Sequence, residues 1–546
     1  MNSILQYFRL YRVLILLLLM QAGSLHTQTP PFNIALAPVN INGLSGLQSY
    51  VFAQHHGKWL LAGGRLDGLH RRQPFATFDL AGHNRLLRVV DPRTLQQWSA
   101  PMSSLPVAIQ EQMSSTNMQF YQEGDYLYCL GGYGYSATAG DHVTFAALTA
   151  IKVPEVIEAI INKRDFAAFF RQITDVQFQV TGGKLKKIDD RYYLLGGQKF
   201  MGRYNPMGPA HGPGFVQEYT DGVRVFTLKD DGIRIEVTHL QTWADRAVFH
   251  RRDYNAEVQI LPDGQQGITM FSGVFQTTTD LPFLNSVTLR STQYKVDSAF
   301  QQYYNHYHCA TLPLYSEKDN EMHTLFFGGI AQYYDSAGTL IRDNNVPFVK
   351  TIARVTRDSK GQMAEYKLPV QMPSFLGAGS EFIPNEDIAH YENGVIRLDA
   401  LTQDSTLAGY IYGGISSSAS NIFWVNDGTQ SSAHHQIFKV YIVRNRSIAA
   451  HDLNEQSIGT LRLQVYPNPT RTGDLLAQFY VEKSASAHIS VWQINGQLIL
   501  EKTLSQLSVG EHLYPLQLDA RTKGGTYIIQ LETPYEKATQ KVVLNP

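Results

Sequence analysis

The chain of 546 residues has little charge and only two cysteines. Charged side chains form 17% of it and the formal net charge is −1, so it lacks the basic surface that nucleic-acid binding requires. Its N-terminal apolar run, Val13–Met20, is far shorter than the ~20 residues of a membrane-spanning helix. No nucleophile elbow, P-loop, Rossmann glycine pattern or zinc-type spacing is present. The sequence therefore supports neither a nucleic-acid partner nor a transmembrane span, and it carries no recognised catalytic motif.

The N-terminus has the pattern of an export signal. Arg9 and Arg12 precede the apolar run, and the small residues Ala22–Ser24 follow it. No cysteine follows the run, so a lipid anchor is not indicated. We predict a signal peptide over residues 1–24 that directs the chain through the inner membrane, after which it is secreted or attached to the outer surface. An uncleaved anchor is the alternative.

A short sequence motif, an apolar run followed by glycine, recurs along the chain. Five copies end in two glycines and one is weaker: Trp59–Gly64, Tyr126–Gly132, Tyr192–Gly197, Leu325–Gly329, Tyr410–Gly414 and Thr269–Gly273. Short aromatic and β-branched runs are typical of strands buried on both faces, and the glycines suit a positive φ or a close backbone approach. The copies resemble the kelch repeat, in which each copy is one four-stranded blade of a β-propeller. The resemblance implies an all-β, six-bladed kelch-type propeller.

Residues 32–445 are the predicted propeller. We expect its blades near residues 46–113, 117–175, 176–248, 252–304, 306–379 and 388–443. Phe32–Ile41 is expected to complete blade six and close the ring. Apolar residues at helical spacing in Pro154–Ile173 predict one or two helices inserted between the third and fourth strands of blade two.

Cys129 and Cys309 fall in opposite blades, too far apart for a disulfide, so we predict two buried thiols.

A second domain follows a polar linker, predicted over residues 446–460. Short alternating strands with regular turns indicate a small Ig-like β-sandwich over residues 461–546. Its motifs resemble those of the C-terminal sorting domain of type IX secretion in Bacteroidetes-type bacteria. The matching residues are Tyr466, Pro467, Asn468, Pro469, Asn495, Gly496, Gly525, Tyr527 and Lys541. The resemblance implies recognition by the outer-membrane secretion machinery. It leaves open whether the domain is then removed, with the remainder released or attached to surface lipopolysaccharide.

The kelch resemblance also implies which face binds ligands. Loops that follow the Gly-Gly strands share one face with the segments that lead into the innermost strands. The residues predicted at this mouth are Arg65, His70, Arg71, Tyr133, Tyr135, Lys199, Arg203, Tyr204, Asn205, Arg252, Asp253, Asn255, His306, His308, Tyr333, Tyr334 and His390. Arginine forks bind carboxylates and aromatic rings stack on sugars, so this mixture favours a polar ligand with hydroxyls or a carboxylate.

Some of these residues have equally plausible structural roles. His306 and His308 alternate like metal ligands, but such a pair is more often structural, and we expect no metal or cofactor. Arg252 and Asp253 could instead form an ion pair that ties two blades together.

Two functions fit the sequence. The first is an exported, non-enzymatic protein that binds a glycan, a peptide or a surface protein at the propeller mouth. The alternative is a carbohydrate-active enzyme like the N-acetylneuraminate epimerases, with Arg203, Arg252, Asp253 and His306 binding a carboxylate and moving protons. A copper site of the galactose-oxidase type would need a cysteine beside a tyrosine at the mouth, and Cys129 lies within a predicted buried strand.

Overall fold

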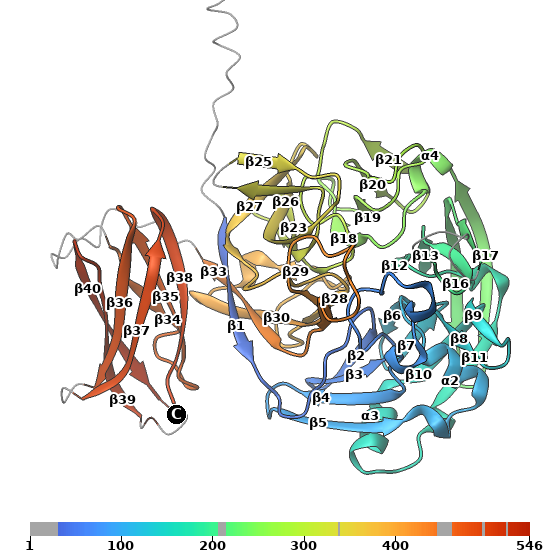
Figure 1. Cartoon of the computed structure of the whole chain (residues 1–546), viewed down its shortest axis with the longest axis horizontal. Coiled ribbons are helices and arrows are strands. Elements are labelled where there is room, and N and C mark those ends of the chain that lie inside the picture. The colour runs from blue at the N-terminus through green and yellow to red at the C-terminus, as the bar shows by residue number, and fades with distance from the viewer. Residues whose placement is uncertain are drawn as a thin grey trace, which may run out of the picture.

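The computed structural model describes residues 31–205, 214–336, 339–444, 461–493, 497–519, 522 and 524–545. Two units follow one another, a ring of β-sheets and a smaller β-sandwich (Figure 1). The predicted signal peptide, the predicted linker and the Asn495-Gly496 turn lie outside the described residues.

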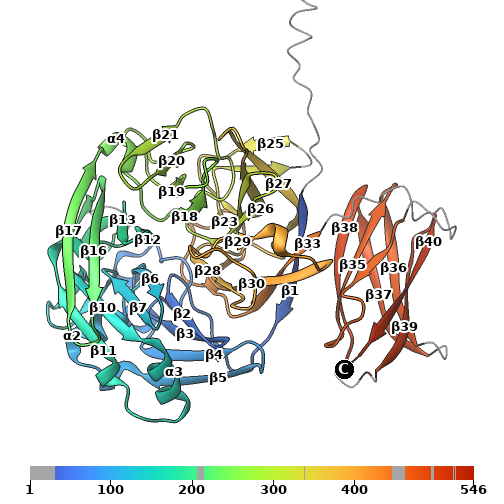
Figure 2. The same cartoon turned by 180° about the vertical axis from the view of Figure 1, so that it is seen from behind.

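Six four-stranded antiparallel blades surround a central axis, as the two opposite views show (Figures 1 and 2). From the innermost to the outermost strand, the first three blades are β2 (Val51–His55), β3 (Lys58–Ala62), β4 (Leu86–Asp91) and β5 (Gln96–Pro101); β6 (Gln119–Glu123), β7 (Tyr126–Leu130), β10 (Ala147–Lys152) and β11 (Phe170–Thr174); and β12 (Lys184–Ile188), β13 (Arg191–Leu195), β16 (Gly222–Asp230) and β17 (Ile235–Ala244).

The other three blades repeat this order. They are β18 (Asn255–Ile260), β19 (Gln266–Phe271), β20 (Ser286–Leu289) and β21 (Tyr294–Asp297); β22 (Ala310–Ser316), β23 (Glu321–Ile330), β26 (Phe348–Arg357) and β27 (Met363–Gln371); and β28 (Ser380–Pro384), β30 (Ser405–Gly413), β33 (Ile437–Arg444) and β1 (Phe32–Val39). The fold is the predicted six-bladed propeller.

Blade six joins the two ends of the propeller. Strand β1 pairs with β33 over its whole length, from Phe32 opposite Arg444 to Val39 opposite Ile437. This pairing confirms that the segment beginning at Phe32 supplies the outermost strand of the last blade. It also covers an edge that β33 would otherwise leave open.

The start of blade six was predicted wrongly. Its innermost strand is β28, beginning at Ser380, and not a segment beginning at Ile388. Ile388 instead lies in the connection between β28 and β30, which also contains the short strand β29 (Ile396–Arg397). Strand β29 adds to the inner edge of blade five, parallel to β22. The polar residues before Ile388 resembled a turn into a strand, whereas β28 ends in a proline and follows Gly377 and Gly379.

The insertion in blade two is one helix followed by a strand. Helix α3 (Val153–Ile161) lies between β10 and β11, as predicted, but the residues from Phe170 onward form β11. The apolar face of α3 packs with the core residues of blade one and fills the wedge between the two blades. The remaining helices are short: α2 (Val107–Met113), α4 (Arg246–Phe249), η1 (Pro74–Ala76), η2 (Leu80–Gly82), η3 (Met102–Ser104), η4 (Ala167–Phe169), η5 (Val176–Phe178) and η7 (Leu398–Ala400).

Four blades carry an extra hairpin after their Gly-Gly strand, where the sequence predicted only loops. These hairpins are β8 (Tyr133–Ser136) with β9 (Asp141–Thr144), β14 (Gln198–Gly202) with β15 (Phe215–Tyr219), β24 (Tyr333–Ser336) with β25 (Thr339–Arg342), and β31 (Ile415–Ser417) with β32 (Ser431–Ala433). Because all four connect the second strand of a blade to the third, they extend the same face of the propeller.

The Gly-Gly pairs connect each blade to the next through backbone hydrogen bonds. In the five full copies both glycines have a positive φ, between 51° and 91°. The N–H of the second glycine donates to a carbonyl in the segment that leads into the next blade, at 2.7–2.9 Å: Gly64 to Ser115, Gly132 to Val180, Gly197 to Arg251, Gly329 to Leu376 and Gly414 to Leu47. A Cβ on the first glycine would lie 1.9–2.7 Å from that same carbonyl oxygen. Glycine is therefore required by both backbone angle and contact distance.

A closed ring of six backbone hydrogen bonds surrounds the axis. Each bond joins the lead-in segments of two neighbouring blades, at 2.7–3.2 Å. Following donor to acceptor, the ring runs from Ser49 to Gly379, His308, Asp253, Gly182, Asn117 and back to Ser49. All of these residues except His308 have a positive φ, which turns their N–H and C=O groups along the ring.

Residues 461–545 form the smaller unit, a sandwich of two sheets. One sheet contains β34 (Gln464–Tyr466), β35 (Asp474–Val481) and β38 (Gly510–Gln517); the other contains β36 (Ala485–Gln493), β37 (Leu498–Leu507), β39 (Gly525–Glu532) and β40 (Lys537–Leu544). Their facing apolar side chains make one core. Tyr466 and Leu476 also pack against Ala35 and Val443 of blade six.

The two cysteines are free and buried, as predicted. Cys129 lies in β7, and Cys309 immediately precedes β22. Burial raises the pKa of the Cys309 thiol to about 12, so it stays protonated at neutral pH.

The glycine contacts give a stability prediction. Gly131→Ala places a Cβ 1.9 Å from the Val180 carbonyl oxygen at a φ of +64°, and should lower the free energy of unfolding by about 2–4 kcal/mol. Gly124→Ala is the matched control, because Gly124 also has a positive φ (+55°) but has open space around its Cβ position. Gly124→Ala should lower the free energy of unfolding by only ~1 kcal/mol. Equal losses in urea denaturation would show that the interblade contact is unimportant.

Candidate functional site

Two cavities open into the central channel from opposite ends. The wide cavity, of about 900 Å³, lies on the face of the Gly-Gly loops; the narrow cavity, of about 360 Å³, lies among the innermost strands. Both include Ser49, Asn117, Asp253 and His308 in their walls. Since these residues belong to the hydrogen-bonded ring, the ring marks the level at which the cavities meet.

Aromatic rings line one side of the wide cavity, and they come from blades one to three. Tyr133 packs edge-on against Phe78 and Phe200, with centroids 5.2 Å apart in each case. Phe200 stacks on Phe215 at 4.9 Å, and Tyr204 contacts both of these rings. Two of the rings come from β14 and β15, so the extra hairpin of blade three builds much of this wall. The wall is preorganised because its rings hold one another in place.

Arg252 lies in the wide cavity beside this wall. Its Nε donates to the Tyr219 hydroxyl at 3.0 Å, and its Nη1 pairs with Asp253. The guanidinium also lies over the ring of Phe275, 5.1 Å from the centroid. Burial alone would lower the pKa of Arg252, but Asp253 and Tyr219 hold it above its usual range. Arg252 is thus a fixed cation, and it both pairs with Asp253 and lines the cavity.

A neutral histidine lies near the top of the wall. His70 packs against Tyr204 at 4.9 Å between centroids, and burial lowers its pKa to about 4. At neutral pH it therefore offers a hydrogen-bonding imidazole and no charge.

Arg65, only 3% exposed, is held by Asp67 through two hydrogen bonds of 2.7 and 2.5 Å.

The structure brings about half of the predicted mouth residues together. Those that line the wide cavity are Arg65, His70, Tyr133, Tyr204, Asn205, Arg252, Asp253 and His308. Asn255 lines only the narrow cavity. Arg203 lies outside the lining and instead bonds the Thr77 carbonyl and Asp79. The others outside the lining are Arg71, Tyr135, Lys199, His306, Tyr333, Tyr334 and His390.

His306 does not face the channel as the sequence suggested. It is fully buried, its Nε2 lies 2.9 Å from the Gln302 carbonyl oxygen, and its Nδ1 accepts from the Gln332 N–H at 3.0 Å. Burial lowers its pKa to about 4. With both nitrogens occupied by backbone groups, His306 organises the start of blade five and is not available to a ligand.

His390 lies at the wrong end of the channel. Its neighbours Glu392, Asn393 and Gly394 line the narrow cavity, and Glu386 accepts from the Gly57 N–H in the turn of the first blade. The error follows from the misplaced start of blade six, because the true lead-in segment to β28 contains Gly377–Gly379.

Several residues of the wide cavity were missed. They are Phe78, Phe215, Tyr219, Phe275, Phe423 and Trp424. All of them belong to the long connections between second and third strands. A search for aromatic residues in these connections, instead of charged ones, would have found most of them. Trp424 is 64% exposed at the rim, with the Arg72 guanidinium 4.0 Å above its ring.

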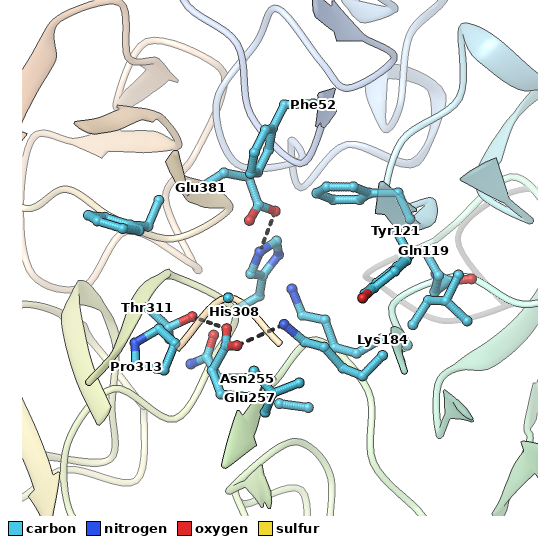
Figure 3. A pocket seen from close by; sticks show the side chains of 18 of the residues that line it. Phe52, Gln119, Tyr121, Lys184, Asn255, Glu257, His308, Thr311, Pro313 and Glu381 are labelled. Atoms are coloured by element: carbon cyan, nitrogen blue, oxygen red, sulfur yellow. Dashed lines mark hydrogen bonds and ion pairs between the residues drawn. The ribbon is translucent and has the colours of Figure 1, made fainter. Parts of the chain in front are cut away.

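The narrow cavity is lined by two pairs of acidic and basic side chains (Figure 3). His308 Nε2 lies 2.8 Å from Glu381 Oε1, and Lys186 lies 2.8 Å from Glu257. Although burial would raise the pKa of Glu381, His308 and the nearby lysines lower it below its usual value. Within the described residues, no group of three or more His, Cys, Asp or Glu side chains is placed to hold a metal ion.

The sorting motif has a structural role in the sandwich. Asn468 bonds the last strand twice, donating to the Lys541 carbonyl at 2.7 Å and accepting from the Val543 N–H at 2.9 Å. Tyr527 is buried in the core, 1% exposed. The opening and closing motifs of the domain therefore meet in space.

His306 and His390 give a direct test of these assignments. His306→Ala removes the partner of two buried backbone groups, so it should lower the free energy of unfolding by about 2–4 kcal/mol. His390→Ala changes an exposed side chain and should have an effect within about 0.5 kcal/mol. Thermal unfolding of both variants measures the difference, and a neutral His306→Ala would contradict the assigned role.

Comparisons with known proteins agree with the division into two units. Residues 464–545 match the family described as the secretion system C-terminal sorting domain. Among curated proteins, none matches the sequence. None of the described helices is long and apolar enough to cross a membrane.

Two of the solved structures found to be similar have very different sequences. One is a fungal alcohol oxidase of the AA5 family in complex with copper, at 8% identity and a TM-score of 0.36, covering 94% of this chain and 99% of that one. The other is YjhT, at 10% identity and a TM-score of 0.39, covering 74% of this chain and all of that one. The propeller assignment rests on the six sheets themselves. The chain is a six-bladed β-propeller that ends in a type IX secretion sorting domain.

Proposed function

We propose that this protein is an exported binding protein that holds a glycan or a peptide in the wide cavity. The main support is the aromatic wall that lies beside the fixed guanidinium of Arg252 in a cavity of about 900 Å³. Ligand sites typically combine a mostly apolar, aromatic lining with a few placed polar groups. This cavity has that composition.

The lining indicates the chemistry of the ligand. The half-buried rings of Phe78, Tyr204 and Phe215 offer aromatic surface for a sugar ring or an aromatic side chain. The buried Tyr133 and Phe200 support them from behind. Arg252 offers a charge suited to a carboxylate, and Trp424 extends the aromatic surface to the rim. A hydroxyl-rich ligand with an acidic group would use both.

The alternative is an enzyme that acts on a sugar acid. Arg252 and Asp253 line the wide cavity, but His306 and Arg203 do not, so two of the four residues considered for catalysis are absent from its lining. Arg252→Ala separates the two functions: loss of sugar-acid turnover in an active preparation supports the enzyme, whereas loss of binding without any turnover supports the binding protein.

The aromatic wall can be tested by substitution. On glycan and peptide arrays the purified protein should retain a ligand, and Tyr204→Ala should weaken that binding about tenfold, corresponding to about 1.4 kcal/mol. Tyr334→Ala is the control, since it makes the same deletion on β24, outside the cavity lining. If both variants bind like the parent, or if no ligand is retained on any array, the proposal fails.

Export by the C-terminal domain predicts a change of location. A chain truncated after Arg444 should stay inside the cell envelope, whereas the full chain should reach the surface or the medium. Immunoblots of the periplasm, outer membrane and medium measure this difference. Equal amounts of both chains in the medium would contradict recognition through the domain.

A further inference from the structure

The narrow cavity is a second site with its own chemistry. It lies on the opposite side of the hydrogen-bonded ring from the wide cavity, and its walls come from the innermost strands. Its volume of about 360 Å³ is at the lower end of the range for small-molecule sites.

The carboxylates of this cavity already have partners. Glu257 accepts from Lys186 on one oxygen and from the Thr311 hydroxyl on the other. Glu381 is paired with His308. Each carboxylate therefore has a direct side-chain partner other than Lys184, and both act on Lys184 only through space.

Lys184 is a cation of this cavity without a direct partner in the part of the chain that the structure describes. Its side chain enters the cavity beside the Lys186–Glu257 pair (Figure 3). Among the described residues, none makes a hydrogen bond or ion pair with its ammonium group. Burial lowers the pKa of Lys184, and the charge of Lys186 adds to this effect, although Glu381 and Glu257 oppose it. An anion next to Lys184 would relieve both unfavourable effects.

Further groups around Lys184 could contact a bound molecule. Gln119, 1% exposed, keeps its Oε1 without a partner, and the Tyr121 hydroxyl has none among the described side chains. The rings of Phe52 and Phe382 and the side chain of Pro313 provide an apolar surface. The cavity therefore combines one unpaired cation, two hydrogen-bonding groups and an apolar wall.

We propose that the narrow cavity binds a small organic carboxylate with an apolar body, with Lys184 as its counter-ion. One ammonium group suits a monoanion. A phosphate dianion would fit less well, because no arginine lines the cavity and the Glu257 and Glu381 carboxylates lie near. The apolar wall favours an aromatic or branched body over a sugar.

The test compares an acid with its neutral analogue. Isothermal titration of the full chain with 4-hydroxybenzoate and with 4-hydroxybenzamide should show the acid binding at least about tenfold more tightly. Lys184→Met should abolish this preference. Lys295→Met, on the exposed face of β21, is the matched control and should keep it. Tyr121→Phe removes only a hydroxyl and should lower the affinity for 4-hydroxybenzoate by a few fold. This variant provides a test even if Lys184→Met does not fold.

Several results would overturn the proposal. These are equal affinities for the acid and the amide, a Lys184→Met variant that folds and retains the preference, or no heat from the acid up to about 10 mM. Displacement of 4-hydroxybenzoate by inorganic phosphate at equal affinity would contradict the assignment of a ligand with an apolar body, since it would show that the site accepts any small anion.

Discussion

The closed ring of backbone hydrogen bonds around the axis determines how the rest of the propeller is arranged. Because each N–H donates to the carbonyl of a neighbouring blade, one bond needs only two adjacent blades, but the ring closes only when all six blades are present. The Gly-Gly pairs add a second set of interblade bonds just outside the ring. Together they fix the spacing of the lead-in segments, and with it the walls of both cavities.

The sequence predicted the features that this geometry imposes on residue type. Gly131 has a positive φ, and a neighbouring carbonyl oxygen lies 1.9 Å from where a Cβ would be, so only glycine is tolerated there. Positions of this kind make the repeat recognisable in the amino-acid sequence. The sixth copy was weaker because Ser272 adopts the same backbone conformation at a φ of 54°. The outermost strand beginning at Phe32 was predictable for a different reason, since a ring needs a partner for its last edge.

The site was only partly predictable because side chains in long connections are placed by tertiary contacts. His306 and His308 are two residues apart, yet one is held between two backbone groups and the other faces the channel. Nothing in their local sequence separates them. Similarly, Phe200 and Phe215 meet because β14 and β15 pair, and the glycine- and proline-rich sequence between these strands gives no sign of a hairpin.

The construction of blade six affects when the protein can fold. Its three inner strands lie at the end of the propeller sequence, whereas β1 begins at Phe32, shortly after the predicted signal peptide. During synthesis β1 has no partner until β33 has emerged, more than 400 residues later. The order of translation thus keeps the ring of blades unclosed until residue 444 of the 546 has been made.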